Sequence, residues 1–410
     1  MEKKKNTPKL RFPEFTGEWE EKKLGEIVIS LDSGVSVNSV NEAIKEESEY
    51  GILKTSCIIS GMFYPDENKR IIDDEVSRAR LNPCADSILI SRMNTPLLVG
   101  ESGYVSSNYS NLYIPDRLWM AKINHETTNS RLLSIILSSK KIKDKITNIA
   151  TGTSGSMKNI SKPNFLNLEI RIPTLLEQTK LATFLTAVDE KLTQLKKKKT
   201  LLEQYKKGVM QKLFSQELRF KDDNNQDFPD WQELPGNYIF KNVSDKNHIS
   251  ELPILAITQE YGAIPRELID YNITVTDKSV DSYKVVQIGD FIISLRSFQG
   301  GIEYSKYNGI CSPAYIILRP IMEIEDCFFK SFFKTELYIK ALNKNIEGIR
   351  DGKMISYKYF SEINLPYPSL PEQQKIATFL LSIDEKINHS SAQIEKMEAW
   401  KKGLLQQMFC

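Results

Sequence analysis

A long internal repeat constrains this chain more than any other feature. The segment Glu177–Leu185 recurs as Glu372–Leu380, a shift of 195 positions, and the same shift continues without a gap to Phe214 and Phe409. Over the 38 positions from Glu177 to Phe214, 16 residues are identical in the two copies. A repeat of this length predicts a chain built from two copies of one structural unit.

Both copies of the repeat show the apolar spacing of a long helix that packs against another helix. Two sets of residues have the four-three spacing of a coiled-coil seam, and the first set is broken once, at Lys199. They are Leu181, Leu185, Val188, Leu192, Leu195 and Leu202, and Ile376, Leu380, Ile383, Ile387, Ile394 and Met397. Pro173 and Pro371 lie where a helix can begin. About 38 helical residues make a rod of roughly 57 Å.

A weaker repeat precedes each helix and predicts two related domains. Leu10–Phe12 with Trp19 resembles Leu218–Phe220 with Trp231, although the two domains otherwise differ strongly in sequence. Both mix β-rich runs with a helical stretch, Ser130–Ile149 or Cys327–Asn345. We expect an α+β protein with a first domain at 1–172, a spacer helix at 173–215, a second domain at 216–368 and a second spacer helix at 369–410.

Two helices that pack through these seams are necessarily antiparallel. The first helix carries the chain from the first domain to the second, and the second helix returns, which gives the repeat a pseudo-twofold axis. DNA-binding dimers with such symmetry read two half-sites about 34 Å apart. Because the domains have diverged and the helices have not, we expect a split, asymmetric DNA target with an unread gap of at most roughly 17 base pairs.

Composition argues against several other classes. The net charge of the 410 residues is only +2, so bulk basicity is not expected to drive nucleic-acid binding. The five cysteines are odd in number and form no C-x-x-C pair, which argues against a disulfide framework and a zinc site. No secretory apolar region follows the lysine-rich start, and no apolar run is long enough to span a membrane. We expect a cytoplasmic protein.

The sequence lacks the motifs of the relevant enzymes. Asn82-Pro83-Cys84-Ala85 is the nearest string to the Asn-Pro-Pro-aromatic motif that holds a flipped adenine, and it lacks the second proline and the aromatic residue. There is no phosphate-binding Gly-x-x-x-x-Gly-Lys motif, and His125, His248 and His389 form no metal or triad pattern. We expect a non-catalytic chain that binds no metal and no cofactor.

A fingerprint spans the start of each helix. It comprises Ile172, Pro173, Glu177, Gln178, Ala182, Leu185 and Asp189, and again Leu365, Pro366, Glu372, Gln373, Ala377, Leu380 and Asp384. This doubled pattern resembles the conserved regions of type I restriction-modification specificity (S) subunits, over essentially the whole chain. The resemblance implies a reader of a bipartite double-stranded DNA site that binds two adenine methyltransferase (M) subunits and, in the full complex, two restriction (R) subunits. S-adenosylmethionine, ATP and magnesium would belong to those partners.

Candidate base-reading residues are polar side chains on loops beside predicted strands, because such side chains recognise base edges. In the first domain they are Lys54, Thr55, Ser56, Arg92, Asn94, Thr153, Ser154, Ser156 and Lys158. In the second domain they are Thr258, Gln259, Arg296, Ser297, Gln299, Arg350 and Lys353. The Gly-Ser-rich loop at 151–158 can equally be a plain connector.

Eight fingerprint or repeat residues are expected to dock helices or partner proteins: Glu177, Gln178, Phe184, Asp189, Glu372, Gln373, Phe379 and Asp384. Trp19 and Trp231 are interpreted as core anchors, and Lys196–Lys199 as a solvated face that can also approach phosphates. Two alternatives stay open. One is a free-standing DNA methyltransferase or nuclease, and the other is a scaffold whose coiled coil only joins other proteins.

Overall fold

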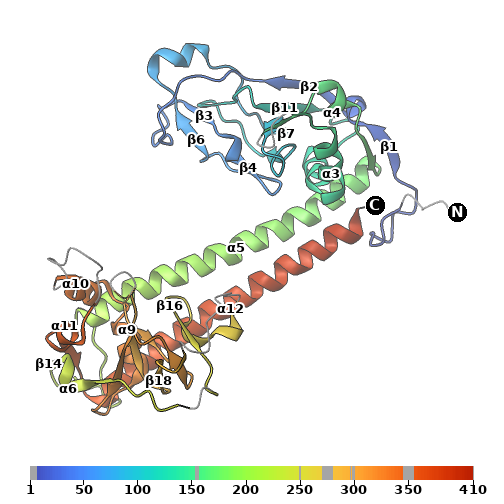
Figure 1. Ribbon diagram of the computed structural model, residues 1–410. Helices are drawn as coiled ribbons and strands as arrows, with labels where there is room; N and C mark the ends of the chain where they lie inside the picture. Colours follow the sequence, from blue (N-terminus) through green and yellow to red (C-terminus); the bar gives the residue numbers. More distant parts are fainter. Residues whose placement is uncertain are drawn as a thin grey trace. The chain divides into compact units, whose positions relative to one another are not determined.

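The computed structural model of the chain describes residues 7–152, 157–248, 251–269, 280–295, 297, 301–344 and 355–409. The residues group into two compact units, Met1–Gln194 together with Ile394–Cys410, and Leu195–Gln393. Each unit therefore combines one mixed domain with part of each long helix (Figure 1).

The domain of the first unit is built around a four-stranded antiparallel sheet. The strand order is β2 (Val28–Ser33), β11 (Leu118–Ile123), β7 (Ser87–Ser91) and β9 (Ser102–Val105). All residues of β7 are buried, as the apolar run in this strand requires. A second sheet has the order β10 (Leu112–Tyr113), β3 (Gly51–Leu53) and β6 (Asn68–Arg70), and two short pairs join β4 (Ile58–Ile59) to β5 (Met62–Phe63) and β8 (Met93–Asn94) to β12 (Lys158–Asn159).

Short helices cover this domain and connect it to the first long helix. They are α1 (Leu24–Ile27), α2 (Ser130–Ser138), α3 (Lys140–Ile149) and α4 (Lys162–Leu166), with 3₁₀ turns η1 (Thr55–Cys57) and η2 (Asp73–Arg78). The helical stretch predicted at Ser130–Ile149 is two helices, because Ser139 takes an extended conformation with ψ of 143° between them. Strand β1 (Glu20–Lys23) pairs antiparallel with β13 (Glu169–Ile172), which leads directly into the long helix.

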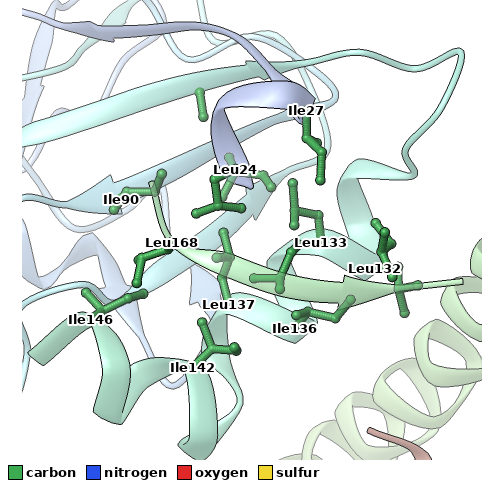
Figure 2. Close-up of a cluster of buried hydrophobic side chains, with 14 of the residues drawn as sticks. Leu24, Ile27, Ile90, Leu132, Leu133, Ile136, Leu137, Ile142, Ile146 and Leu168 are labelled. Atoms are coloured by element: carbon green, nitrogen blue, oxygen red, sulfur yellow. The ribbon is translucent and has the colours of Figure 1, made fainter. Parts of the chain in front are cut away.

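The largest apolar cluster of the first unit lies between these helices and the sheet. Figure 2 shows Leu24 and Ile27 of α1, four side chains of α2, Ile142 and Ile146 of α3, Leu168 and Ile90 of β7 gathered in one cluster. Trp19 is 3% exposed and belongs to the same cluster, so its interpretation as a core anchor is confirmed. Leu181, Leu185, Leu404 and Met408 extend the cluster onto the two long helices.

The second unit repeats this plan with different residues. Its four-stranded antiparallel sheet has the order β15 (Phe240–Val243), β22 (Ile316–Pro320), β19 (Phe291–Ile293) and β20 (Glu303–Tyr304). Three further antiparallel pairs join β14 (Gln232–Pro235) to β23 (Asn364–Tyr367), β16 (Leu255–Thr258) to β17 (Gly262–Pro265), and β18 (Lys284–Val286) to β21 (Gly309–Cys311). Its helices are α6 (Gly236–Ile239), α9 (Asp326–Phe332), α10 (Glu336–Lys344) and α11 (Tyr357–Ser361), with the 3₁₀ turn η3 (Arg266–Leu268).

Aromatic side chains dominate the core of the second unit. Phe240 packs edge-on against Phe291 and Phe329, with ring centroids 5.4 and 5.3 Å apart. Trp231 makes an edge contact with Phe328 at 5.9 Å and lies at the border of this cluster. Such edge contacts add directional attraction to the burial of apolar surface. The two domains therefore share a four-stranded antiparallel sheet and a strand pair before the long helix, over two differently composed cores.

The two long helices predicted from the repeat are confirmed as α5 (Leu175–Phe214) and α12 (Leu370–Met408). In the first unit, residues from the start of α5 pack against residues from the end of α12. In the second unit the end of α5 (Val209, Leu213) packs with the start of α12 (Ile376, Leu380). The pair is thus antiparallel within each unit. In the part of the chain that the structure describes, no helix has the length and apolar character that crossing a membrane requires.

The seam predicts a difference between two leucines of α5. Leu185 is 1% exposed and Leu201 is 54% exposed. We expect Leu185→Ala to lower the free energy of unfolding of the first unit by about 2–4 kcal/mol, because it leaves a cavity in the cluster. Leu201→Ala, in the part of α5 that belongs to the second unit, should change the free energy of unfolding of that unit by less than about 0.5 kcal/mol. Urea unfolding followed by circular dichroism measures both, and equal losses would contradict the packing described here.

Candidate functional site

Three predicted base-reading residues lie directly after β3. Lys54 follows the strand, and Thr55 and Ser56 begin η1. The hydroxyl of Ser56 donates to Glu67 at 2.7 Å, and the Lys54 ammonium lies 3.5 Å from the same carboxylate. These contacts lower the pKa of Glu67, with the Ser56 hydrogen bond as the larger cause. The loop is therefore held by an internal carboxylate.

The strand pair β8–β12 brings three further candidates together. Asn94 of β8 lies opposite Lys158 of β12, and the amide of Ile160 donates to the carbonyl of Arg92. Asn94 is 8% exposed, and its side chain donates to Ser91 and accepts from the amide of Thr95. Its amide group therefore shapes the turn, while Arg92 and Lys158 remain partly exposed beside it.

Arg92 is held by an aromatic ring. Its guanidinium carbon lies 5.7 Å from the ring centroid of Trp119, a cation–π distance. Its Nε is buried without a hydrogen-bond partner in the described structure. A guanidinium fixed in this way loses little conformational entropy when it binds, and its planar fork matches the two acceptors of guanine.

The candidates of the second domain lie at the tip of the β16–β17 hairpin and after β19. The Thr258 hydroxyl donates to the Gly262 carbonyl at 3.2 Å and accepts from the Tyr261 amide, which closes the turn. Gln259 is exposed at this tip. Ser297 is 1% exposed and its hydroxyl accepts from the Ser294 amide, so its side chain stabilises the turn. Thr153, Ser154, Ser156, Arg296, Gln299, Arg350 and Lys353 lie outside the described residues.

Sequence reasoning missed exposed residues in the same turns. Tyr261 is 58% exposed next to Gln259, and Leu97 is 81% exposed in the turn after Asn94. An aromatic residue in a polar turn, Glu260-Tyr261-Gly262, is the signal that would have identified the first. Leu97 follows Pro96 and gives no such signal.

A buried carboxylate marks the start of each long helix. Glu177 is completely buried and accepts a two-pronged ion pair from Arg11, at 2.7 and 2.6 Å, and a hydrogen bond from Trp19 at 3.4 Å. Glu372, its equivalent 195 positions later, is also completely buried and accepts the same two-pronged pair from Arg219, at 3.2 and 3.0 Å. These hydrogen bonds raise the pKa of Arg219 further above its ordinary value.

The glutamine that follows each carboxylate ties the helix to its domain. Gln178 accepts from the Asn129 amide at 2.8 Å and donates to the Pro173 carbonyl. Gln373 accepts from the Glu325 amide at 3.0 Å and donates to the Pro368 carbonyl. Asn129 and Glu325 are the N-cap residues of α2 and α9. The same contact therefore fixes equivalent helices in the two units.

The remaining docking residues join the helices to each other and to the segment before each domain. Asp189 accepts from Lys401 at 2.5 Å, and Asp384 accepts from Lys206 at 2.6 Å. The repeat relates the two pairs, because Asp384 lies 195 positions after Asp189 and Lys401 lies 195 positions after Lys206. Phe184 packs on Phe12 and Trp400, and Phe379 packs on Phe220. The ion pairs of the two aspartates and the contact of each phenylalanine with the segment before its domain therefore recur in both copies of the repeat.

Among the described residues, no group of three or more His, Cys, Asp or Glu side chains has the geometry to hold a metal ion. His125, His248 and His389 lie on different segments of the chain. Two features stand out among the described residues. One is the set of polar turns at strand ends, and the other is a repeated helix mount, the contacts of Glu177, Gln178 and Asp189 that recur at Glu372, Gln373 and Asp384.

These features define a class: a duplicated α+β protein in which each of two diverged domains is held by the same buried contacts to the long helix that follows it. The family described as the type I restriction modification DNA specificity domain matches residues 16–204 and 233–399. The chain belongs to this family, the DNA specificity subunits of type I restriction-modification systems.

Individual relatives agree over nearly the full length. The type I restriction enzyme MjaVIII specificity subunit of Methanocaldococcus jannaschii is 25% identical over 425 aligned residues, which cover 97% of this chain and 92% of the relative. The crystal structure of a type I restriction-modification S subunit from M. genitalium has a TM-score of 0.58 at 19% identity and covers 98% of this chain and 99% of that one. A structure described as showing complex assembly and conformational transition of the type I system has a TM-score of 0.54 at 17% identity, covering 95% of this chain and 97% of that one. The structural likenesses show a shared fold.

The buried carboxylate gives a prediction for the second unit. We expect Arg219→Met to lower the free energy of unfolding by about 3–5 kcal/mol, because it leaves Glu372 buried without its partner. Adding Glu372→Gln to that variant should restore much of the loss, because the unpaired charge is gone. Lys221→Met removes an exposed ion pair with Asp227 and should cost less than about 1 kcal/mol. Chemical denaturation measures all three, and additive losses in the double variant would refute the coupling.

Proposed function

We propose that this subunit reads a bipartite, asymmetric DNA site and directs adenine methylation or restriction by partner subunits, with one half-site recognised by each domain. The observation that carries the proposal is the contrast between mounts and reading loops. The contacts of Glu177, Gln178 and Asp189 recur at Glu372, Gln373 and Asp384. Repeated mounts suit two identical partners, and diverged loops suit two different half-sites.

The loops at equivalent positions differ in the chemistry that they can offer to DNA. Lys54–Ser56 after β3 presents an ammonium and hydroxyls, whereas Thr258, the last residue of β16, and Gln259, which follows it, present a hydroxyl and an amide. A lysine or arginine prefers the acceptors of guanine, and a glutamine side chain prefers the donor and acceptor of adenine. Unlike half-sites therefore follow from unlike loops.

We further propose that the two long helices set the length of the unread gap. Both α5 and α12 are continuous and contribute residues to both units. A continuous helix transmits a fixed rise of about 1.5 Å per residue, which a flexible linker does not. In the same proposal the chain itself is non-catalytic and cytoplasmic and binds no cofactor. S-adenosylmethionine, ATP and magnesium are bound by two M and two R subunits.

Variants of Arg92 and Gln259 test the assignment of half-sites. We expect Arg92→Met to weaken binding of the M-containing complex about tenfold or more and to relax base preference in one half-site only. Gln259→Leu should relax the other half-site only. Arg171→Met, on the strand that pairs with β1, serves as the matched control and should leave both unchanged. Selection of bound sequences from a random duplex library measures the preferences, and a change in the same half-site for both variants would contradict the assignment.

Shortening both helices tests the gap. Deletion of residues 195–201 together with their repeat equivalents 390–396 removes one heptad from each helix and keeps the seam in phase. The preferred gap should shorten by about three base pairs, because seven residues span about 10.5 Å and one base pair about 3.4 Å. Both half-site sequences should persist. Methylation mapping with the partner subunits present reports both, and an unchanged gap would exclude the helices as its determinant.

A further inference from the structure

Lys54 and Glu67 extend the β3–β6 strand pair of the first domain by one position. Leu53 lies opposite Asn68 in this pair, and the Lys54 amide donates to the Glu67 carbonyl at 3.0 Å. Leu53 and Asn68 are buried, and successive side chains alternate between the two faces of a strand pair. Lys54 and Glu67 therefore lie side by side on the outer face, where their side chains are 33% and 43% exposed.

Buried contacts fix the position of Glu67. The Asn68 side chain accepts from the Ile44 amide and donates to the Pro65 carbonyl, both at 2.9 Å. The Glu67 amide donates to the Tyr64 carbonyl at 3.2 Å, which closes the turn before β6. A side chain placed by a strand pair and a closed turn is better preorganised for recognition than one on an open loop.

The pair presents a donor group beside an acceptor group. The Lys54 ammonium lies 3.5 Å from Oε2 of Glu67, and the Ser56 hydroxyl donates to the same oxygen at 2.7 Å. The Ser56 hydrogen bond and the Lys54 ammonium lower the pKa of Glu67. The carboxylate is therefore ionised at neutral pH and can only accept, whereas the ammonium can only donate.

The major-groove edge of a G·C base pair matches this arrangement. Guanine presents the acceptors N7 and O6, and cytosine presents its N4 amino donor beside O6. The hydrogen bond within the base pair holds N4 and O6 about 2.9 Å apart. This spacing is close to the 3.5 Å between Nζ of Lys54 and Oε2 of Glu67.

An A·T base pair fits less well in either orientation. With adenine in the place of guanine, Glu67 would face O4 of thymine, and two acceptors repel each other. With thymine in the place of guanine, Lys54 would meet one acceptor, O4, where guanine offers two. The pair therefore selects G·C both by attraction and by exclusion.

We propose that Lys54 and Glu67 together read one G·C base pair in the half-site of the first domain, with the ammonium donating to guanine and the carboxylate accepting from the amino group of cytosine. This inference rests on the proposed function and adds Glu67 as a specificity-determining residue. At the end of the β16–β17 pair in the second domain, Thr258 lies opposite Gly262, and neither carries a charge. The G·C requirement of this pair therefore belongs to one half-site.

The test uses the full chain in complex with its methyltransferase subunits. Lys54→Met should weaken binding of the preferred duplex about tenfold or more and remove the preference at one base pair, within the half-site that Arg92→Met changes. Glu67→Gln should narrow the preference for G·C over A·T at the same base pair about tenfold, because the glutamine amide can donate to thymine O4. Selection of bound sequences from a random duplex library measures both.

Glu42→Gln is the matched control, because it removes the same charge from another exposed ion pair, with the Lys45 ammonium 3.7 Å away and outside the β3–β6 pair. It should change no base preference and should alter affinity less than about twofold. Surface ion pairs contribute little to stability, so all three variants should unfold within a few degrees of the unaltered chain.

Base analogues separate base reading from a phosphate contact. At the assigned position, 7-deazaguanine lacks N7 and should weaken binding of the unaltered complex about fivefold or more, and binding of Lys54→Met less than about twofold. Inosine lacks only the minor-groove amino group of guanine and should leave both unchanged.

A uniform loss of affinity across all sequences in Lys54→Met, with a weaker dependence on salt, would overturn the inference in favour of a phosphate contact. So would an unchanged preference in Glu67→Gln, or changes at different base pairs in the two variants. Absence of any base preference in the unaltered complex would instead overturn the proposed function.

Discussion

The buried ion pair at the start of each long helix determines how the rest of the chain can be arranged. Glu177 and Glu372 are fully buried, and each is paired with an arginine from the start of its own domain, 166 and 153 positions earlier in the chain. A buried carboxylate at a helix N-terminus benefits from the helix dipole, yet it is costly without its cation. The segment at the start of each domain and the segment at its end are therefore both anchored to the long helix that follows the domain.

This constraint explains why the two domains could diverge without losing their mounts. The closing contacts use the segment before each domain, the strand pairs β1–β13 and β14–β23, and the glutamine beside each carboxylate. None of them involves the turns that carry Lys54, Arg92 or Gln259. Substitutions in the turns can therefore accumulate while the contacts that hold each domain to its helix are kept.

The helices and their pairing were predictable because their signal is periodic and repeated. The four-three spacing located the seam, although it stopped at Leu202 and Met397, whereas burial continues to Leu213 and Met408. The reading turns were less predictable, since their side-chain roles depend on contacts distant in sequence. Asn94 is drawn inward by Ser91, and Arg92 is held by Trp119, which is 27 positions away (119 − 92). The pair of Lys54 and Glu67 depends on the register of β3 against β6, which no local pattern indicates.

Exchange of one domain tests the central claim most directly. In a chain whose residues 220–367 are replaced by residues 12–172, both mounts would carry the first domain, since each segment begins at the equivalent phenylalanine and ends with the last residue of the equivalent strand, Tyr367 of β23 or Ile172 of β13. Methylation mapping of this chain with its partner subunits should yield a symmetric site, two inverted copies of one half-site separated by the original gap. A chain that fails to fold, or one that still methylates the original asymmetric sequence, would contradict the account.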